Sequence, residues 1–453
     1  MIYKPSRPSK WQKYQASLQK ASRRKHFLKR LPSLAVIAGL ASVVVVILVF
    51  LGIGLTDELN KPRPQPPAAK EQDKKQAGRR PEPATALDLK AAIEGLARDS
   101  AKLGEPAILH ANGRRYFIST AIHAKLQKYI LKTLKRSRTQ QSAVVVMDSH
   151  NGRLLAMVNY DANGDTDNLC LQANFPAASL FKIVTAAAAL ESAGLKPDQG
   201  YYYRGNKHTL YKSQLKTKKD RWTTQTSFRK AFAYSNNAVF GKIGIYDLGQ
   251  DKLMRYSEKF FFNRPIASDL PVAVSRVTIP ADDFGLAEIA SGFNKETLIS
   301  PMHAALLAAV AVNKGSMPAP RLVDSIRNDS NEVIYQASLP AMKTTVNRQT
   351  AQDLKLIMQD AVRYGTGRTA FRKLRRKKRF KKFDLGAKTG TINDREDRFK
   401  YDWVTAFATS PDGAGSICVS VLGVHGKILG TRSTEMTRAI VDYYFSTVGK
   451  KKP

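Results

Sequence analysis

Short apolar runs and helical periodicities divide this chain into a region with one long apolar segment and a larger region of strands and helices. Two runs rich in β-branched residues, 142–149 and 153–160, flank the dipeptide Asn151-Gly152, which is typical of a tight hairpin turn. Similar apolar runs recur near the C-terminus, at 384–391, 403–410 and 416–424. The pattern therefore predicts two strands early and three strands late in the larger region.

Helical periodicity fills the chain between these two groups of strands and follows the second group. The predicted helices span residues 179–193, 228–246, 301–313, 349–364 and 434–448. Strands at both ends of a long helical stretch predict one α+β domain. In it a single sheet is assembled from both ends, and a helical subdomain is inserted between them. We place this domain at residues 117–453.

The long apolar segment at residues 34–55 predicts one transmembrane helix. At 1.5 Å per residue it extends for roughly 33 Å, and the hydrocarbon core of a bilayer is about 30 Å thick. Ten Lys and Arg residues and no acidic residue precede it in the tail 1–33. Because basic flanks stay in the cytoplasm, we expect a cytoplasmic N-terminus and an extracytoplasmic domain. A cleaved signal peptide is the alternative, but its apolar core is shorter than this run.

Between the apolar segment and the domain, the composition changes twice. Residues 56–85 combine six prolines with Lys, Arg and Gln, which is typical of a semi-rigid solvated linker. Residues 86–116 form a short segment before the domain, with a helix predicted at 88–103. This stretch is too short for a second large domain.

The composition of the 453 residues narrows the classes of protein and of partner. An apolar share of 43% excludes a wholly disordered chain, and the formal net charge of +37 makes nucleic acid, anionic lipid and acidic polymers candidate partners. Because the charge is spread over several segments without a recognition motif, we expect no nucleic acid. Two cysteines, Cys170 and Cys418, exclude a disulfide scaffold and a four-cysteine metal site. We expect both to be buried free thiols.

The first candidate for chemistry is the motif Ser-x-x-Lys at Ser179 and Lys182. The pattern recurs elsewhere in the chain, but here it opens an apolar helical run that continues to Leu190. Residues three apart on a helix lie on one face, and a helix N-terminus favours a developing negative charge. A neutral Lys182 would accept the hydroxyl proton of Ser179, provided that burial or another cation disfavours its ammonium form.

Two further motifs follow in the chain. Ser235 and Asn237 form a Ser-x-Asn motif at the start of another apolar helical run. Residues 388–391 contain the only Lys-Thr-Gly of the chain, Lys388, Thr389 and Gly390, followed by Thr391. In a strand Lys388 and Gly390 share one side, and a glycine there allows the close approach of a ligand backbone. The cation and the hydroxyl groups suit a carboxylate ligand.

These three motifs, in this order and with their flanks, resemble those of the penicillin-binding proteins, specifically their serine transpeptidase domain. The matching neighbourhoods are FPAASLFKIVTAAAALE, AYSNNAVFGKIG and AKTGTIND followed by YDWVTAFA. The resemblance implies the α+β fold of penicillin-binding proteins and serine β-lactamases, an antiparallel sheet flanked by helices with a helical subdomain. It also implies a monofunctional, membrane-anchored D,D-transpeptidase of the bacterial cytoplasmic membrane. Such an enzyme cross-links peptidoglycan stem peptides and is inhibited covalently by β-lactams.

The resemblance also implies a role for each motif residue. Ser179 is the nucleophile, Lys182 the base for acylation, and Ser235 the relay that delivers a proton to the leaving D-alanine. Asn237 binds the substrate amide, and Lys388, Thr389, Gly390 and Thr391 line the carboxylate and oxyanion site. Serine acyl transfer of this kind requires no metal and no cofactor. The implied partners are stem peptides, β-lactams, the membrane and other cell-wall synthesis proteins.

Three features leave alternatives open. Ala178 stands where many members of the family have glycine, which leaves open the geometry of the turn before Ser179. The segment 368–382 carries ten basic residues and no acid, so it forms either a solvated hairpin or a contact for an anionic envelope polymer or a membrane surface. The same motifs also occur in D,D-carboxypeptidases and β-lactamases, although the Glu-x-x-Leu-Asn run that serves β-lactamase deacylation is missing here. A non-catalytic β-lactam sensor or scaffold would retain the motifs as well.

Overall fold

The computed structural model describes residues 86–98, 100, 103–164, 167–216, 219–338, 343–413 and 415–448. The predicted tail 1–33, transmembrane helix 34–55 and linker 56–85 lie outside these residues. Within the described ranges, none of the helices combines the length and the apolar character that crossing a bilayer requires.

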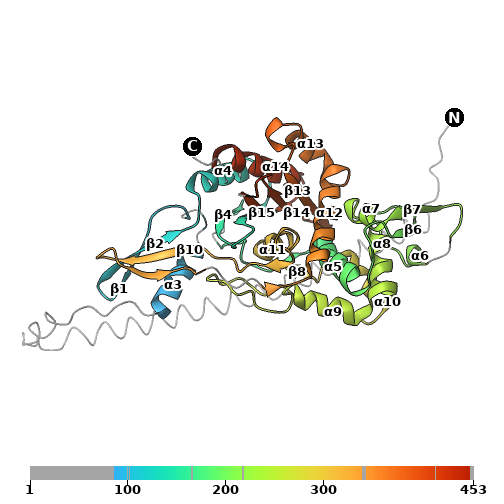
Figure 1. Ribbon diagram of the computed structural model, residues 1–453, viewed down its shortest axis with the longest axis horizontal. Helices are drawn as coiled ribbons and strands as arrows, with labels where there is room; N and C mark the ends of the chain where they lie inside the picture. Colours follow the sequence, from blue (N-terminus) through green and yellow to red (C-terminus); the bar gives the residue numbers. More distant parts are fainter. Residues whose placement is uncertain are drawn as a thin grey trace, which may run out of the picture. The chain divides into compact units, whose positions relative to one another are not determined.

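A five-stranded antiparallel sheet forms the centre of the domain, in the order β13-β14-β15-β3-β4 (Figure 1). Its strands are β3 (Gln141–Asp148), β4 (Leu154–Asp161), β13 (Asp384–Asn393), β14 (Lys400–Thr409) and β15 (Ser416–His425). The pairing of β15 with β3 joins the late strands to the early hairpin. The prediction of one sheet assembled from both ends of the domain is therefore confirmed, and β13 lies at an edge.

The two faces of this sheet support separate cores, because successive strand residues point to opposite sides. In β3, Val144 and Val146 pack into one core, whereas Ala143, Val145 and Met147 pack into the other. Both faces are apolar, as expected for a sheet covered by helices on each side. The domain is thus a three-layer structure.

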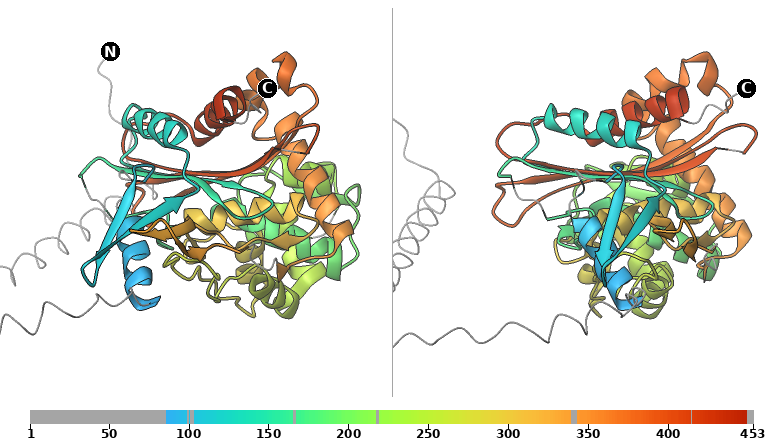
Figure 2. Two further views of the ribbon diagram at one scale, coloured as in Figure 1. Left: turned by 60° about the vertical axis from the view of Figure 1, so that its left-hand side comes forward. Right: turned by 90° about the vertical axis from the view of Figure 1, so that its left-hand side faces the viewer.

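One face is covered by α4 (Ala124–Lys135), α13 (Arg368–Arg375) and α14 (Ser433–Tyr443), which continues as a π-helical turn (Tyr444–Val448). Figure 2 shows these helices on one side of the sheet and the remaining helices on the other. Their apolar residues, such as Leu126, Phe371 and Ile440, are fully buried against the strands.

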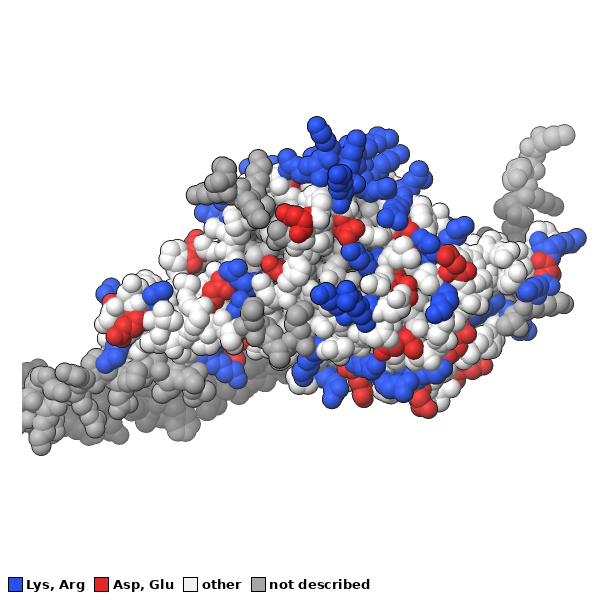
Figure 3. All heavy atoms as spheres, in the orientation of Figure 1, with Lys and Arg blue, Asp and Glu red and all other residues white. Residues whose placement is uncertain are grey.

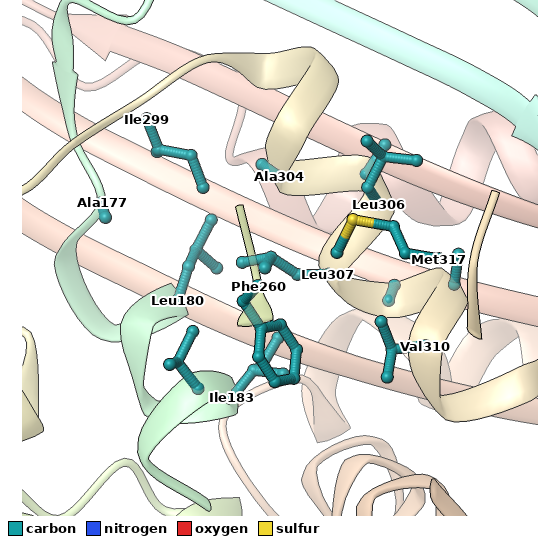
Figure 4. Close-up of a cluster of buried hydrophobic side chains, with 14 of the residues drawn as sticks. Ala177, Leu180, Ile183, Phe260, Ile299, Ala304, Leu306, Leu307, Val310 and Met317 are labelled. Carbon is teal, nitrogen blue, oxygen red and sulfur yellow. The ribbon is translucent and has the colours of Figure 1, made fainter. Parts of the chain in front are cut away.

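The other face is covered by α11 (Pro301–Val312), α5 (Lys182–Ser192) and α12 (Arg348–Arg363). Helix α11 is apolar on all sides and almost entirely buried, as expected for a helix inside a domain. Leu306, Leu307 and Val310 of α11 lie in one cluster with Leu180 and Ile183 (Figure 4). The N-terminus of α5 therefore packs against α11.

A helical subdomain is inserted between α5 and α11, as predicted. Its elements are β6 (Gly200–Arg204), α6 (Lys212–Leu215), β7 (Thr223–Ser227), α7 (Phe228–Ala233), α8 (Asn237–Lys242), a π-helical segment (Ile243–Leu248), α9 (Gly249–Lys259) and α10 (Asp283–Ser291). The single helix expected at 228–246 is wrong, because the chain leaves the helical conformation at residues 234–236. The side chain of Asn236 accepts a hydrogen bond from the Val239 amide and so starts a new helix.

A second sheet, not predicted, has the order β1-β2-β10-β11. It comprises β1 (Ala107–Ala111), β2 (Arg114–Thr120), β10 (Val323–Asn328) and β11 (Val333–Gln336). Helix α3 (Ala86–Arg98) precedes it, so the helix expected at 88–103 is present with an earlier end. The predicted domain boundary at residue 117 falls inside β2.

Short strand pairs and a turn complete the described structure: β5 (Phe175–Pro176) with β8 (Leu298–Ile299), β9 (Ser316–Met317) with β12 (Lys343–Thr344), and a 3-10 turn at Lys378–Phe380. The solvated hairpin considered for 368–382 is wrong, because its first half is helix α13. Phe371 and Leu374, three apart, are buried on one face of that helix. Cys170 and Cys418 are buried free thiols, as expected.

Candidate active site

Ser179 lies on a 3-10 turn, Ala178–Phe181, that leads directly into α5. The α-helix expected from residue 179 thus begins at Lys182. Ala178 has a φ of +48°, a left-handed conformation that is uncommon for a residue with a side chain. This turn leaves Ser179 partly exposed, whereas Ala178 and Leu180 beside it are buried.

The amine of Lys182 lies at the centre of a buried set of hydrogen bonds. Its Nζ is 3.0 Å from Ser179 Oγ and 2.7 Å from Asn237 Oδ1. It also donates to the carbonyl oxygen of Ser291, at the end of α10. Three acceptors from three different elements therefore fix the amine beside the hydroxyl of Ser179.

Burial lowers the pKa of Lys182 well below its ordinary value, and the nearby charge of Lys388 lowers it further. The side chain is fully buried, and no carboxylate lies within ion-pair distance of it among the described residues. Both effects disfavour the ammonium form. For Lys182 to accept a proton, its ammonium form must be disfavoured by burial or by another cation, and this environment supplies both effects.

The second motif lies in the turn between α7 and α8. Ser235 has a φ of +56°, and the hydroxyl of this buried residue accepts a hydrogen bond from Lys388 Nζ at 2.9 Å. Asn237 donates through Nδ2 to the carbonyl of His208 at 2.8 Å, which orients its Oδ1 toward Lys182. The broken helix thus presents Ser235 and Asn237 to the same site.

The third motif lies in the middle of edge strand β13. Lys388 is fully buried, and its Nζ donates to Ser235 Oγ and to the carbonyl of Thr389 at 2.8 Å. Burial lowers the pKa of Lys388 to about 7. The hydroxyl of Thr389 lies 2.6 Å from that of Thr366, in the turn after α12.

Two glycines allow the strand and α10 to approach the turn of Ser179. A Cβ atom on Gly390 would lie 3.3 Å from the amide nitrogen of Ser179. A Cβ atom on Gly292, which has a φ of +63°, would lie 2.0 Å from the carbonyl oxygen of Ala178. A side chain at Gly292 would therefore displace the turn that carries Ser179.

A buried carboxylate lies behind the end of the third motif. Asp402 accepts hydrogen bonds from the Ser433 amide at 2.8 Å, from Arg432 Nε at 3.1 Å and from Thr391 Oγ1 at 3.4 Å. Burial acts to raise the pKa of Asp402, but the nearby imidazole of His425, the hydrogen bond from the Ser433 amide and the charge of Arg432 hold it below its ordinary value. The ionised carboxylate thus links β14, α14 and Thr391.

The structure brings all eight predicted site residues into one region, linked directly or through a neighbour. Ser179, Lys182 and Asn237 form one hydrogen-bonded group, Ser235 and Lys388 form another, and Thr389, Gly390 and Thr391 continue along β13. The sequence did not indicate the Ser291 carbonyl, Gly292 or Asp402. A carbonyl has no sequence signal, although a glycine ending an apolar helix is a signal for a left-handed C-cap.

Across the described parts of the chain, no three His, Cys, Asp or Glu residues are grouped so that they could hold a metal ion.

The sequence model described as "Penicillin binding protein transpeptidase domain" matches residues 142–442. The chain therefore belongs to the penicillin-binding protein transpeptidase domain family. The predicted family is confirmed.

Curated relatives are similar at low identity. Stage V sporulation protein D of Bacillus subtilis is 26% identical over 268 residues, 56% of this chain and 40% of the relative. Peptidoglycan D,D-transpeptidase PbpA of Mycolicibacterium smegmatis is 25% identical over 315 residues, which is 62% of each chain. This chain thus spans 40% and 62% of the length of these two relatives.

Solved structures confirm the fold. The D,D-transpeptidase domain of a peptidoglycan glycosyltransferase from Eggerthella lenta superposes with a TM-score of 0.60 at 22% identity, covering 73% of this chain and 83% of that one. Penicillin-binding protein A from M. tuberculosis, as the penicillin G acyl-enzyme complex, gives 0.58 at 24% identity, covering 72% and 80%. The predicted transpeptidase fold, with an antiparallel sheet and flanking helices, is confirmed.

Proposed function

We propose that this protein is a membrane-anchored serine D,D-transpeptidase that cross-links peptidoglycan stem peptides through an acyl-enzyme. The observation that carries the proposal is the buried Lys182 amine, 3.0 Å from Ser179 Oγ, with a pKa held far below its ordinary value. The family membership supports it, as do relatives named peptidoglycan D,D-transpeptidase. Membrane anchoring rests on the sequence of residues 34–55.

In the proposed acylation step, Lys182 takes the proton of Ser179 as its oxygen attacks the carbonyl of the penultimate D-alanine. The amide nitrogens of Ser179 and Thr391 receive the developing negative charge. Gly390 supports this role, because its missing side chain lets β13 approach Ser179. The amide group of Asn237 holds Lys182 and binds the substrate amide.

The leaving D-alanine then requires a proton and a site for its carboxylate. Ser235 is suited to deliver the proton, because its hydroxyl lies beside the Lys388 amine that donates to it. Lys388 and the hydroxyl groups of Thr389 and Thr391 form the proposed carboxylate site. An amine from a neighbouring stem peptide then attacks the ester of Ser179 and forms the cross-link.

The proposed arrangement in the cell follows from the chain outside the described residues. A cytoplasmic tail, residues 1–33, precedes a single membrane span and a linker, and the transpeptidase domain acts on the outer side of the bacterial cytoplasmic membrane. Other cell-wall synthesis proteins are the expected partners.

Mass spectrometry after incubation with a labelled penicillin tests the proposal. One adduct is expected, on the peptide that contains Ser179, and it should be lost in Ser179→Ala and Lys182→Ala. An adduct on any other residue, or an unlabelled wild type that is correctly folded, would overturn the proposed nucleophile.

The lifetime of that adduct separates the transpeptidase from the hydrolytic alternatives. A transpeptidase retains the acyl group for long periods, whereas a β-lactamase releases it rapidly to water. Incubation with purified stem peptides then distinguishes cross-linked product from simple release of D-alanine. Cross-linking that persists in Ser179→Ala would identify a non-catalytic protein.

A further inference from the structure

The segment 368–382 is the most strongly charged surface of the described structure, and the proposed acyl transfer does not use it. Its ten basic residues are all exposed, and the segment contains no acid. Figure 3 shows the blue side chains of Lys and Arg gathered densely at the top of the molecule, around α13. We call this surface the α13 patch: Arg368, Arg372, Lys373, Arg375, Arg376, Lys377, Lys378, Arg379, Lys381 and Lys382.

Among the residues that the structure describes, most of these cations have no ion-pair partner. Within the described ranges, Lys377 is the one member of the patch in an ion pair, 2.5 Å from Asp442. Arg379 donates to the hydroxyl of Ser446, and Arg375 donates to the carbonyl of Arg363 at 3.4 Å. Ten like charges in fifteen residues repel one another, so a bound polyanion would relieve repulsion that the fold itself leaves uncompensated.

The patch also contains a hollow of about 180 Å³. It is lined by three basic residues, Arg363, Arg375 and Lys381, together with Gln359, Val362, Phe380, Phe383 and Leu385. Guanidinium groups bind phosphate through paired hydrogen bonds, and lysine adds a point charge. The hollow is therefore suited to one phosphate-type group, and the surrounding cations are suited to its neighbours along a chain.

We propose that the α13 patch binds a flexible polymer that carries phosphate groups, with one group seated in the hollow between α12 and α13. The proposal is independent of the acyl-transfer chemistry. It gives the chain a second binding site, distinct from the proposed acyl-transfer site at Ser179.

A membrane surface is disfavoured as the partner by the packing of α13. A helix that lies in a bilayer interface inserts an exposed apolar face, whereas Phe371 and Leu374 are fully buried against the sheet. In addition, α3, through which the chain from the predicted membrane span reaches the domain, packs into the core on the opposite face of the sheet (Figure 2). Nucleic acid is disfavoured because the two aromatic residues of segment 368–382, Phe371 and Phe380, are fully buried and offer no face on which bases could stack.

The patch is joined to the catalytic region at both of its ends. Thr366 precedes the segment and contacts Thr389, and Lys388 follows it on β13. A polymer held on the patch would therefore lie beside the edge of the sheet that carries the third motif. The site would keep the domain close to a polymer-rich layer of the envelope while stem peptides react at Ser179.

The test uses the full-length chain in nanodiscs of zwitterionic lipid and a fluorescent linear polyphosphate of about 50 units as the probe. Binding is measured by fluorescence anisotropy between about 50 and 200 mM salt. The slope of the logarithm of the binding constant against the logarithm of the salt concentration is roughly −0.7 for each phosphate that the protein neutralises. A quintuple variant, R372Q/K373Q/R375Q/K378Q/K381Q, should weaken binding more than about 100-fold, at about fivefold per cation. Its salt slope should be shallower by about 3 to 4.

Two matched controls make the test specific. The tail variant K4Q/R7Q/K10Q/K13Q/K20Q removes the same charge from the N-terminus and should change the affinity by less than about threefold. The single variants Arg375→Gln and Arg372→Gln each remove one exposed charge, but only Arg375 lines the hollow, so its loss should weaken binding at least about three times more.

Each other result would overturn the proposal. Equal losses in the patch and tail variants would mean non-specific attraction, and unchanged binding in the quintuple variant would exclude the patch. Tighter capture of anionic vesicles than of polyphosphate would identify a membrane surface instead. Acylation by a fluorescent penicillin should be unchanged in every variant, so a failure here is separable from a failure of the proposed enzyme chemistry.

Discussion

Replacing Lys182 by methionine is the sharpest test of the proposed chemistry, because it removes the amine and keeps most of the side-chain volume. In the wild type this amine donates to Asn237 Oδ1 and the Ser291 carbonyl, and its nitrogen lies 3.0 Å from Ser179 Oγ, close enough to accept the hydroxyl proton. A positioned general base contributes about 10² to 10⁴ to a rate. We therefore expect the second-order rate of acylation by penicillin to fall about 1,000-fold, or about 4 kcal/mol of transition-state free energy.

The chain offers a matched control for this variant. Lys242 is also a buried lysine whose pKa is lowered by burial, and its amine donates to the Tyr202 carbonyl at 2.8 Å. It lies on α8 and has no contact with Ser179 among its hydrogen bonds in the described residues. Lys242→Met should acylate within about threefold of the wild type, because it removes a buried amine without removing the base.

The assay is the rate of acylation by a fluorescent penicillin, followed by rapid quench and gel fluorescence across a pH series. Below about pH 7, where Lys388 keeps its charge, the wild-type rate should rise with pH as Lys182 loses its proton, since only the neutral amine accepts the proton of Ser179. Lys182→Met should lack this rise. A variant that acylates within about tenfold of the wild type, or an equal loss in Lys242→Met, would refute the role of Lys182 as the base.

Three further predictions concern the surroundings of this pair. Burial lowers the pKa of Lys388 to about 7. The ammonium group of Lys388 in the free protein therefore loses its charge above that pH, and the rate of acylation should then decline. Lys388→Arg keeps its charge and should show no such decline. Gly292→Ala should slow acylation and lower the melting temperature by several degrees through its clash with Ala178, whereas Gly194→Ala, with a similar φ of +64° and open space around it, should leave the acylation rate unchanged. Asp402→Asn should reduce the loss of thermal stability on acidification. A carboxylate whose pKa is lowered in the folded state stabilises the fold at a pH above its ordinary pKa, and this contribution is lost as the pH falls through the folded pKa. Identical plots of melting temperature against pH for the variant and the wild type would contradict this.

The sequence determined the features that depend on neighbouring residues. The Asn-Gly turn and the apolar runs beside it defined the β3–β4 hairpin, and helical periodicity located α11 and α12 with bounds close to those observed. The three motifs predicted the eight residues that the structure brings into one region, but they gave no sign of Asp402, whose carboxylate accepts from Thr391. Local periodicity decides which face of an element is apolar, so this information is present in short segments.

Only the tertiary structure decided the features that depend on residues far apart. The short contacts around Ala178 follow from how the end of α10, strand β13 and the turn of Ser179 pack together. The Ser291 carbonyl, Gly292 and Asp402 act through contacts that span more than ten residues of sequence. The pKa of Lys182 was likewise decided by tertiary structure, because burial and the approach of Lys388 exist only when strands from both ends of the domain form one sheet.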